Sequence, residues 1–168
     1  MTVFLERDIE QIVRQESQLV FKSFNANIAW ALGCKLKTLA ETLNASLVID
    51  ISLHDRQLFY CAMPGTTPDN ADWARRKRNT VLRCHQSSYR VGLKFSLEGG
   101  SFSEKTGASL QDYAVHGGGF PITLEALGCI GAITVSGLPQ REDHELVVQA
   151  LAKHLDQSLN DLKLEALA

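Results

Sequence analysis

A histidine followed by three glycines, His116 to Gly119, is the run in this sequence whose residue types best suit chemistry. A histidine side chain exchanges protons near neutral pH, and consecutive glycines let the backbone approach a ligand closely. In lipases and esterases, an HGGG loop donates backbone N–H groups to an oxyanion. Those enzymes also need a GxSxG motif, and the nearby Ser136 has no glycine two residues before it. The loop is therefore expected either to hold a small anionic or planar ligand, or to allow a tight turn or subunit contact without chemistry.

Four consecutive cations, Arg75 to Arg78, form the second candidate group. Each residue of a helix advances about 100°, so these side chains spread around most of the helix. Lys77 lies one turn after Trp73, within the apolar stripe. Its stem could pack there below a solvated ammonium, or its amine could be held at a pocket to bind a carboxylate or phosphate, or pair with Asp143. We favour the held amine, because the neighbouring arginines already supply solvated charge.

The segment from Ser136 to His144 is the third candidate group. Ser136 to Pro139 precede the last helix, and the N-terminus of a helix attracts anions. His144 heads the apolar stripe of that helix, where a histidine is more often a core or interface residue than a ligand. Hairpin geometry is expected to bring this segment to the same sheet edge as the glycine loop. The candidate ligand-binding residues are His116, Gly117, Gly118, Gly119, Lys77, Arg75, Arg76, Ser136 and His144.

The helices that position these groups follow from apolar periodicity. Residues 5–16 have helical composition, and a stripe over residues 29–43 predicts a helix that an asparagine just before it can cap. A turn at residues 65–70 leads into the basic helix. A final stripe over residues 144–159 predicts the last helix.

Strands are predicted where apolar and polar residues alternate. Residues 89–97 alternate in the same way, but Tyr89, Leu93 and Leu97 also share a helix face, so strand and helix are both open from the pattern alone. Strands joined mainly as hairpins, with long helices near both ends, indicate an α+β fold with an antiparallel sheet. The predicted strands cover residues 19–24, 47–53, 58–63, 120–125 and 129–136.

Composition limits the functions that are open. A chain of 168 residues with 45% hydrophobic residues fits a single domain with one core. A net charge of -2 provides no general basic field, so we expect neither a nucleic acid nor a membrane as partner. Charged residues stand where a secretory signal needs an apolar run, so we expect a cytoplasmic protein. The four cysteines have no metal-ligand spacing and are expected to be buried free thiols, and no metal site is predicted.

Four runs carry a family resemblance: GTTPDNADWARRKRN from Gly65, CHQSSY from Cys84, HGGGFPI from His116 and VSGLPQREDHELV from Val135. In this order and spacing, they resemble the uncharacterised small bacterial and fungal proteins of the GlcG/HbpS-like group, whose shared domain is often labelled haem-degrading. The resemblance implies a profilin-like fold of α/β/α layers, with a five-stranded antiparallel sheet flanked by helices. It also favours a helix over residues 89–97, and a homo-oligomer. Residues 1–168 are then a single such domain, with residues 1–16 as an N-terminal helical extension.

Three functions remain open at this point. The first is an oligomeric cytoplasmic protein that binds a small anionic or planar ligand near the HGGG loop. Haem is one such ligand, with His116 or His144 as an axial contact, and its binding would be reversible because no CxxCH motif is present. The second is a small enzyme that uses His116 or His144 as an acid or base. The third is an interaction module whose basic helix docks an acidic partner.

Overall fold

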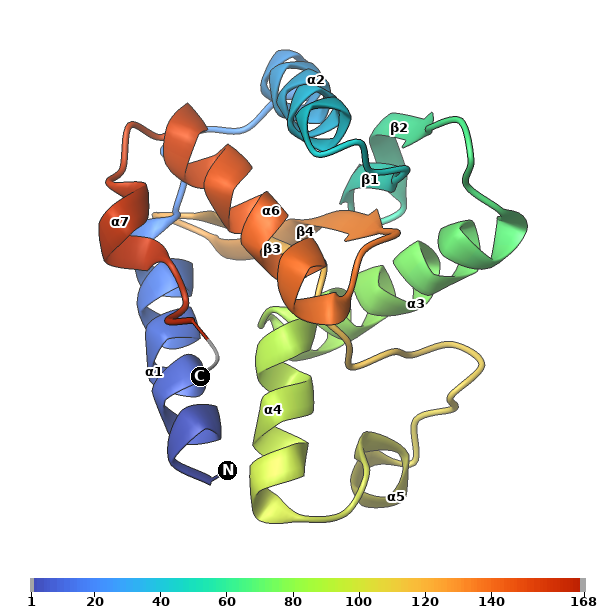
Figure 1. The fold of residues 1–168 in the computed structure, drawn as a ribbon, viewed down its shortest axis with the longest axis vertical. Coiled ribbons are helices and arrows are strands. Elements are labelled where there is room, and N and C mark those ends of the chain that lie inside the picture. The colour runs from blue at the N-terminus through green and yellow to red at the C-terminus, as the bar shows by residue number, and fades with distance from the viewer. Residues whose placement is uncertain (1, 167–168) are drawn as a thin grey trace.

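A four-stranded antiparallel sheet is the middle layer of this computed structural model, which describes residues 2–166 (Figure 1). The sheet order is β2-β1-β4-β3. Its strands are β1 (Val48–Leu53), β2 (Arg56–Ala62), β3 (Gly119–Leu124) and β4 (Gly128–Ser136). The helices are α1 (Thr2–Gln18), α2 (Ala26–Thr42), α3 (Pro68–Cys84), α4 (Ser88–Glu98), α5 (Phe102–Thr106), α6 (Gln140–His154) and α7 (Leu159–Leu162). The predicted α+β class with an antiparallel sheet is confirmed.

The two predicted hairpins are confirmed, and they meet in the middle of the sheet. β1 pairs with β2, and β3 pairs with β4. The hairpins join through β1 and β4, where Ile49 lies opposite Val135. This pairing buries β1 on both of its faces. It also places the start of β3 beside the end of β4, with Gly119 opposite Thr134.

The sheet of the described residues has four strands, so the five strands implied by the family resemblance are wrong for this chain. The run at residues 19–24, predicted as a strand, makes only one isolated parallel bridge, between Phe21 and Leu124. In this connection between α1 and α2, which Asn25 caps, Phe21 donates its N–H to the carbonyl of Thr123 at 2.8 Å and accepts the N–H of Glu125 at 3.0 Å. The contact with the edge of β3 is therefore confined to Phe21 and forms no strand.

Different helices cover the two faces of the sheet (Figure 1). Helices α2 and α6 pack on one face, where Ile49 and Ile51 join Leu36 in the main apolar core. Helix α3 packs on the opposite face, where Nη1 of Arg78 lies 3.0 Å from Oδ2 of Asp50 on β1. The alternation of apolar and polar residues along β1 therefore separates an apolar layer from a more polar one.

Residues 89–97 are helical, as the family resemblance favoured. Ser87 caps α4 by accepting a backbone N–H. Tyr89 and Leu93 pack against α1, whereas Val91 packs toward α5. The alternating pattern therefore reflects a helix that is buried on two sides, which is why it resembles a strand in the sequence.

The predicted N-terminal helix is confirmed as α1, which packs along α4 (Figure 1). Asp8 of α1 pairs with Arg141 of α6, so this extension is tied to the rest of the domain. No helix within residues 2–166 combines the length and apolarity needed to cross a membrane.

Candidate functional site

A pocket of about 260 Å³ lies where α3, the loop before β3 and the N-terminal end of α6 meet. We call it the polar pocket. Four predicted site residues line it: Lys77, His116, Gly117 and Ser136. The other lining residues are Asp69, Asn70, Trp73, Gly137, Leu138, Gln140 and Asp143. The structure therefore brings the glycine loop, the end of β4 and the basic helix together.

Lys77 and Asp143 form a buried ion pair in the wall of the polar pocket. Nζ of Lys77 lies 3.0 Å from Oδ2 of Asp143, and each side chain is 3% exposed. Nζ also donates a hydrogen bond to the carbonyl of Gly117 at 2.8 Å. Burial lowers the pKa of Lys77 and raises the pKa of Asp143, while their mutual attraction opposes both shifts. Of the two interpretations of Lys77, the structure supports the held amine, paired with Asp143.

The carboxylate of Asp143 lies at the N-terminal end of α6, where the sequence led us to expect an anion. Its Oδ1 accepts a hydrogen bond from the backbone N–H of Leu138 at 3.0 Å, and its Oδ2 accepts one from Gly137 at 3.4 Å. The backbone donors that were expected to attract an anion therefore hold a carboxylate of the chain itself. Lys77 neutralises that carboxylate.

The glycine loop is pressed between α3 and α6. A Cβ atom on Gly117 would lie 1.8 Å from the carbonyl oxygen of Gln140. Gly118 has a φ of +120°, and a Cβ atom there would lie 2.5 Å from Nζ of Lys77. Close approach therefore explains why these positions lack side chains.

Ser88, at the start of α4, binds the backbone of the same loop. Its Oγ donates a hydrogen bond to the carbonyl of His116 at 2.5 Å and accepts one from the N–H of Gly119 at 3.0 Å. Val135 donates its N–H to the carbonyl of Gly118 at 2.9 Å. The backbone of the loop is thus largely occupied by contacts within the chain, and only Gly117 of the three glycines lines the pocket.

Trp73 and His116 form a wall between the polar pocket and a second pocket. Their ring centroids are 4.9 Å apart in an edge-to-face arrangement. The second pocket, of about 210 Å³, is the apolar pocket, and its lining is Trp73, Arg76, Phe102, Leu110, Tyr113, Ala114, Val115 and His116. The polar pocket and the apolar pocket therefore share Trp73 and His116.

The imidazole of His116 is exposed at this wall. Partial burial of the ring lowers its pKa, and the charges of Lys77 and Arg76 lower it further. His116 is therefore neutral at physiological pH. A neutral imidazole can accept a proton or bind a metal ion.

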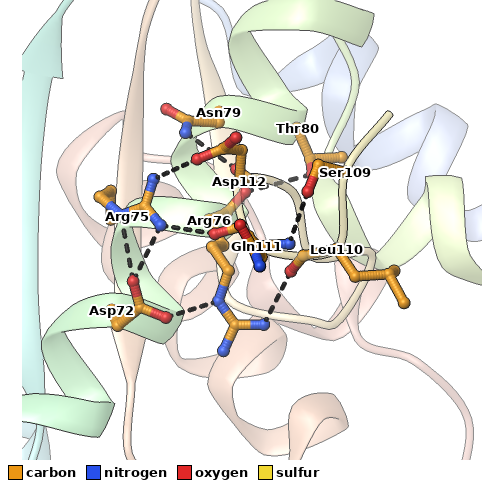
Figure 2. Close-up of polar contacts among 9 residues, drawn as sticks. All are labelled: Asp72, Arg75, Arg76, Asn79, Thr80, Ser109, Leu110, Gln111 and Asp112. Carbon is orange, nitrogen blue, oxygen red and sulfur yellow. Dashed lines mark hydrogen bonds and ion pairs between the residues drawn. The ribbon is translucent and has the colours of Figure 1, made fainter. Parts of the chain in front are cut away.

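Arg75 and Arg76 hold the segment Ser109–Asp112 against α3 (Figure 2). Arg75 pairs with Asp72 at 2.9 Å and with Asp112 at 3.1 Å. Nε of Arg76 lies 2.7 Å from Oδ2 of Asp72, and its guanidinium carbon lies 4.0 Å from the ring centroid of Trp73. Arg75 therefore lines neither pocket, whereas Arg76 lies at the apolar one.

His144 does not line either of these pockets. It is fully buried, with Nε2 2.8 Å from Oε1 of Gln15, and its ring lies near Tyr89 and Phe120. Burial lowers its pKa to about 3, and the charge of Arg141 adds to this. His144 and His116 were expected at one sheet edge, but the structure places the His144 ring in the interior. It is a core residue.

None of the four cysteines lines either pocket. All four cysteines are free, but the expectation that they are buried was wrong. Cys34 is exposed on α2, and the others are half-buried. Across residues 2–166, no group of three or more histidine, cysteine or acidic side chains is arranged to hold a metal ion.

Several residues of the site were missed by sequence reasoning. Asp69 and Trp73 precede the predicted Lys77 at four-residue steps on α3, so the helical period could have placed them at the same pocket. Gln140 likewise stands three residues before Asp143 on α6, which was considered only as a partner of Lys77. Ser88 was not among the predicted site residues, and no local signal points to its contact with the distant glycine loop.

Comparison with known proteins agrees with this fold. A family model described as "Haem degrading protein HbpS-like" matches residues 24–152. The chain belongs to the HbpS-like family. A UPF0303 protein of Azotobacter vinelandii is 52% identical over 98% of this chain and 99% of its own length. Another, from Serratia proteamaculans, is 49% identical over 92% of this chain and 96% of its own.

Two solved structures share the HbpS-like fold with this chain. The crystal structure of the Ybr137w protein has a TM-score of 0.82 and 29% identity, covering 88% of this chain and 87% of that one. The structure titled "PduOC:Heme Complex" has a TM-score of 0.67 and 16% identity, covering 77% of this chain and 94% of that one. The second likeness concerns the fold alone.

Proposed function

We propose that this protein reversibly binds a small, flat, anionic ligand of the haem class at the wall formed by Trp73 and His116. The observation that carries the proposal is the sharing of these two residues by a polar and an apolar pocket. An amphipathic ligand can then bury its apolar part on one side and keep its polar groups near solvent. Membership of the HbpS-like family supports a ligand of this class, as does the haem complex of the similar PduOC fold.

The apolar pocket suits the flat part of the ligand. Trp73, Phe102, Tyr113 and His116 surround it with aromatic rings. Arg76 stands at the same pocket and supplies a planar cation, which suits a carboxylate on the edge of a flat ligand.

His116 is the residue we propose as a direct ligand for iron. Its ring is exposed and neutral, and an imidazole in this state can bind haem iron from one side. The chain therefore provides one axial ligand, and the described residues provide no competing metal cluster. His144 is unsuited to this role, because it is fully buried and bonded to Gln15.

The volumes of the two pockets limit how much of a ligand each can enclose. Typical ligand pockets enclose roughly 300–1,000 Å³, and the two pockets at this wall measure about 260 and 210 Å³. A small planar anion would fit within the apolar pocket. A haem is larger than this pocket, so only part of it could be held there, with His116 and Arg76 as the residues that would hold it.

A haemin titration tests this proposal. Wild-type protein should shift the Soret band, and His116→Ala should weaken binding by at least tenfold because the axial nitrogen is lost. His154→Ala is the matched control, since the His154 ring also lies against an aromatic side chain, Phe21, and burial also lowers its pKa. Metal-free protoporphyrin should lose less affinity than haemin does in His116→Ala, because only the packing of the ring is lost. The absence of a Soret shift in wild type would reject haem, and an equal shift in His116→Ala would reject this site.

The basic helix is less suited to docking an acidic partner, because its cations are engaged within the chain. Arg75 and Arg76 pair with Asp72, Arg78 pairs with Asp50, and Lys77 pairs with Asp143. Each cation is thus balanced by a carboxylate of the chain, so the helix presents little net charge to an acidic protein surface, although Arg76 still lines the apolar pocket. Ligand binding is therefore the function that we retain, and a cytoplasmic location stays a prediction.

We also propose that the protein is a homo-oligomer. Trp30 on α2 is 64% exposed and lies beside Phe59, and Tyr60 on β2 is 46% exposed. Exposed aromatic residues of this kind are enriched in protein interfaces. Size-exclusion chromatography with light scattering should give a multiple of 18.5 kDa, and Trp30→Ser should reduce it. A monomer mass at all concentrations would refute the proposal.

A further inference from the structure

The proposed haem binding gives no role to the amine of Lys77. It lines the polar pocket, yet its side chain is 3% exposed. Two hydrogen-bond acceptors hold it, the carbonyl of Gly117 and Oδ2 of Asp143. An ammonium has three donors, so one N–H remains beyond these two contacts. The nitrogen is thus fixed in position at the wall of a pocket.

We propose that Lys77 is a carbonyl-reactive amine that forms a reversible imine with a small, neutral hydroxyaldehyde in the polar pocket. The geometry that carries this is a buried nitrogen at the pocket wall with a carboxylate 3.0 Å away. The site shares Trp73 and His116 with the apolar pocket proposed for a planar ligand, but Lys77 and Asp143 line the polar pocket alone, and the proposal does not depend on ligand binding at the apolar one.

The chemistry requires an amine that can lose its proton. Burial lowers the pKa of Lys77 and raises the pKa of Asp143, so both shifts favour transfer of the proton from the ammonium to the carboxylate. The free amine then attacks the aldehyde carbon, forming a C–N bond and a carbinolamine. Asp143 returns the proton to the carbinolamine hydroxyl, which leaves as water as the C=N bond forms. Nothing is oxidised or reduced.

The substrate carbon must approach the amine from the polar pocket, which Lys77 lines. On the other side Gly118 lies against Nζ, and a Cβ atom there would approach it to 2.5 Å, so a side chain would displace the nitrogen. The pocket itself encloses about 260 Å³, which limits the substrate to a small molecule. The glycine at this position therefore lets the amine keep its place at the pocket wall.

The charge and polarity of the pocket define the class of aldehyde. Lys77 is balanced by Asp143, and Asp69 adds a further carboxylate, so the pocket does not favour an anionic substrate such as a keto acid. Asn70, Ser136 and Gln140 offer hydrogen bonds to hydroxyl groups. A neutral hydroxyaldehyde meets both conditions.

Reductive trapping in the wild-type protein tests the proposal. The protein is incubated with glycolaldehyde and cyanoborohydride at pH 6 and pH 7, and the labelled lysines are mapped by peptide mass spectrometry. Lys22, Lys94 and Lys153 are exposed and serve as internal controls. Their amines are solvated, whereas burial of Lys77 favours its uncharged form. Lys77 should therefore be labelled at least about tenfold faster than the exposed lysines.

Because the wild-type protein is used, a folding defect cannot obscure the result. If Lys77 is unlabelled, or is labelled no faster than the exposed lysines, the proposal is overturned. Asp143→Asn retains an oxygen for the N–H of Leu138 but removes the group that returns a proton to the carbinolamine, so labelling of Lys77 should slow several-fold even though loss of the carboxylate favours the free amine. An unchanged or faster rate in that variant would overturn the assigned role of Asp143. A failed haemin titration leaves these outcomes unaffected.

Discussion

The two faces of the sheet differ in what they bury. On the face covered by α2 and α6, the core consists of fully buried aliphatic side chains such as Leu36, Ile49 and Ile51. On the face covered by α3, buried polar groups gather instead, among them Lys77 and Thr80. Both pockets at the Trp73–His116 wall adjoin α3, and neither adjoins α2.

The aliphatic face of the sheet contributes mainly to stability, whereas the polar face positions the candidate site. An aliphatic core is tolerant, because its packing depends mainly on volume and shape. A polar layer is demanding, because each buried group needs its partner. Thr80 bonds the carbonyl of Ala114 at 2.9 Å, and Ser88 bonds that of His116, so the loop before β3 takes one conformation. The polar layer therefore fixes the site, and the aliphatic layer supplies the stability that allows it.

Breaking the buried ion pair should have the largest effect. Lys77→Met leaves the carboxylate of Asp143 buried without its cation, and we expect a loss of about 4 kcal/mol in the free energy of unfolding. Chemical denaturation measures this loss. The double variant Lys77→Met with Asp143→Asn should lose clearly less, because no unpaired charge remains. Equal losses in the two variants would show that the pair is not what stabilises this layer.

A truncation in the aliphatic layer should be nearly as destabilising, but without effect on the site. Leu36 is fully buried on α2, so Leu36→Ala should cost about 3 kcal/mol through lost burial and a cavity. Haemin affinity should stay within about twofold, since α2 does not line either pocket. A large loss of affinity in the folded variant would mean that the two layers are coupled.

Sequence patterns predicted most of the fold because each layer leaves a local periodic signal. The alternation along β1 and the stripe of α2 are such signals. The pattern at residues 19–24 was misleading, because periodicity does not say whether a segment finds a partner along the sheet edge, and here the pairing is a single bridge between Phe21 and Leu124. The number of strands in the sheet therefore depends on tertiary contacts.

The site was predicted only in part, because its contacts are long-range. Lys77 was recognised as an anomaly within an apolar stripe, and its pairing with Asp143 was one of the predicted outcomes. His144 presented the same anomaly, yet its partner is Gln15 on a helix far away in sequence. Local pattern identifies a buried polar residue, but only the tertiary structure says which partner satisfies it.

The same substitution can be compared at two glycines, Gly118 in the packed loop and Gly100 in the exposed connection between α4 and α5. Gly118→Val places a side chain against Nζ of Lys77 and the carbonyl of Val135, at a φ of +120°, so we expect a loss of roughly 3 kcal/mol. Gly100→Val also has a positive φ, but its nearest neighbour is the flexible end of Lys105 at 3.3 Å, so about 1 kcal/mol is expected. Melting temperatures of the two variants compare them. Equal losses would contradict the close packing of the loop.

The smallest expected effect is the pH dependence contributed by His144. Burial holds its folded pKa at about 3, against about 6.5 in the unfolded chain. Between these values the unfolded state binds more protons, so the stabilising term is fully present above pH 6.5 and is lost as the pH falls toward 3. From pH 7 to pH 5 this loss of stability amounts to roughly 2 kcal/mol.

The variant His144→Gln tests this pH dependence. It removes the titration while retaining an amide that can bond Gln15, so its free energy of unfolding should fall less than that of wild type over the same interval. The raised pKa values of Asp143 and Glu145 act in the opposite direction in both proteins, and they cancel in the difference between wild type and variant. Parallel pH profiles for the two would show that His144 does not carry this dependence.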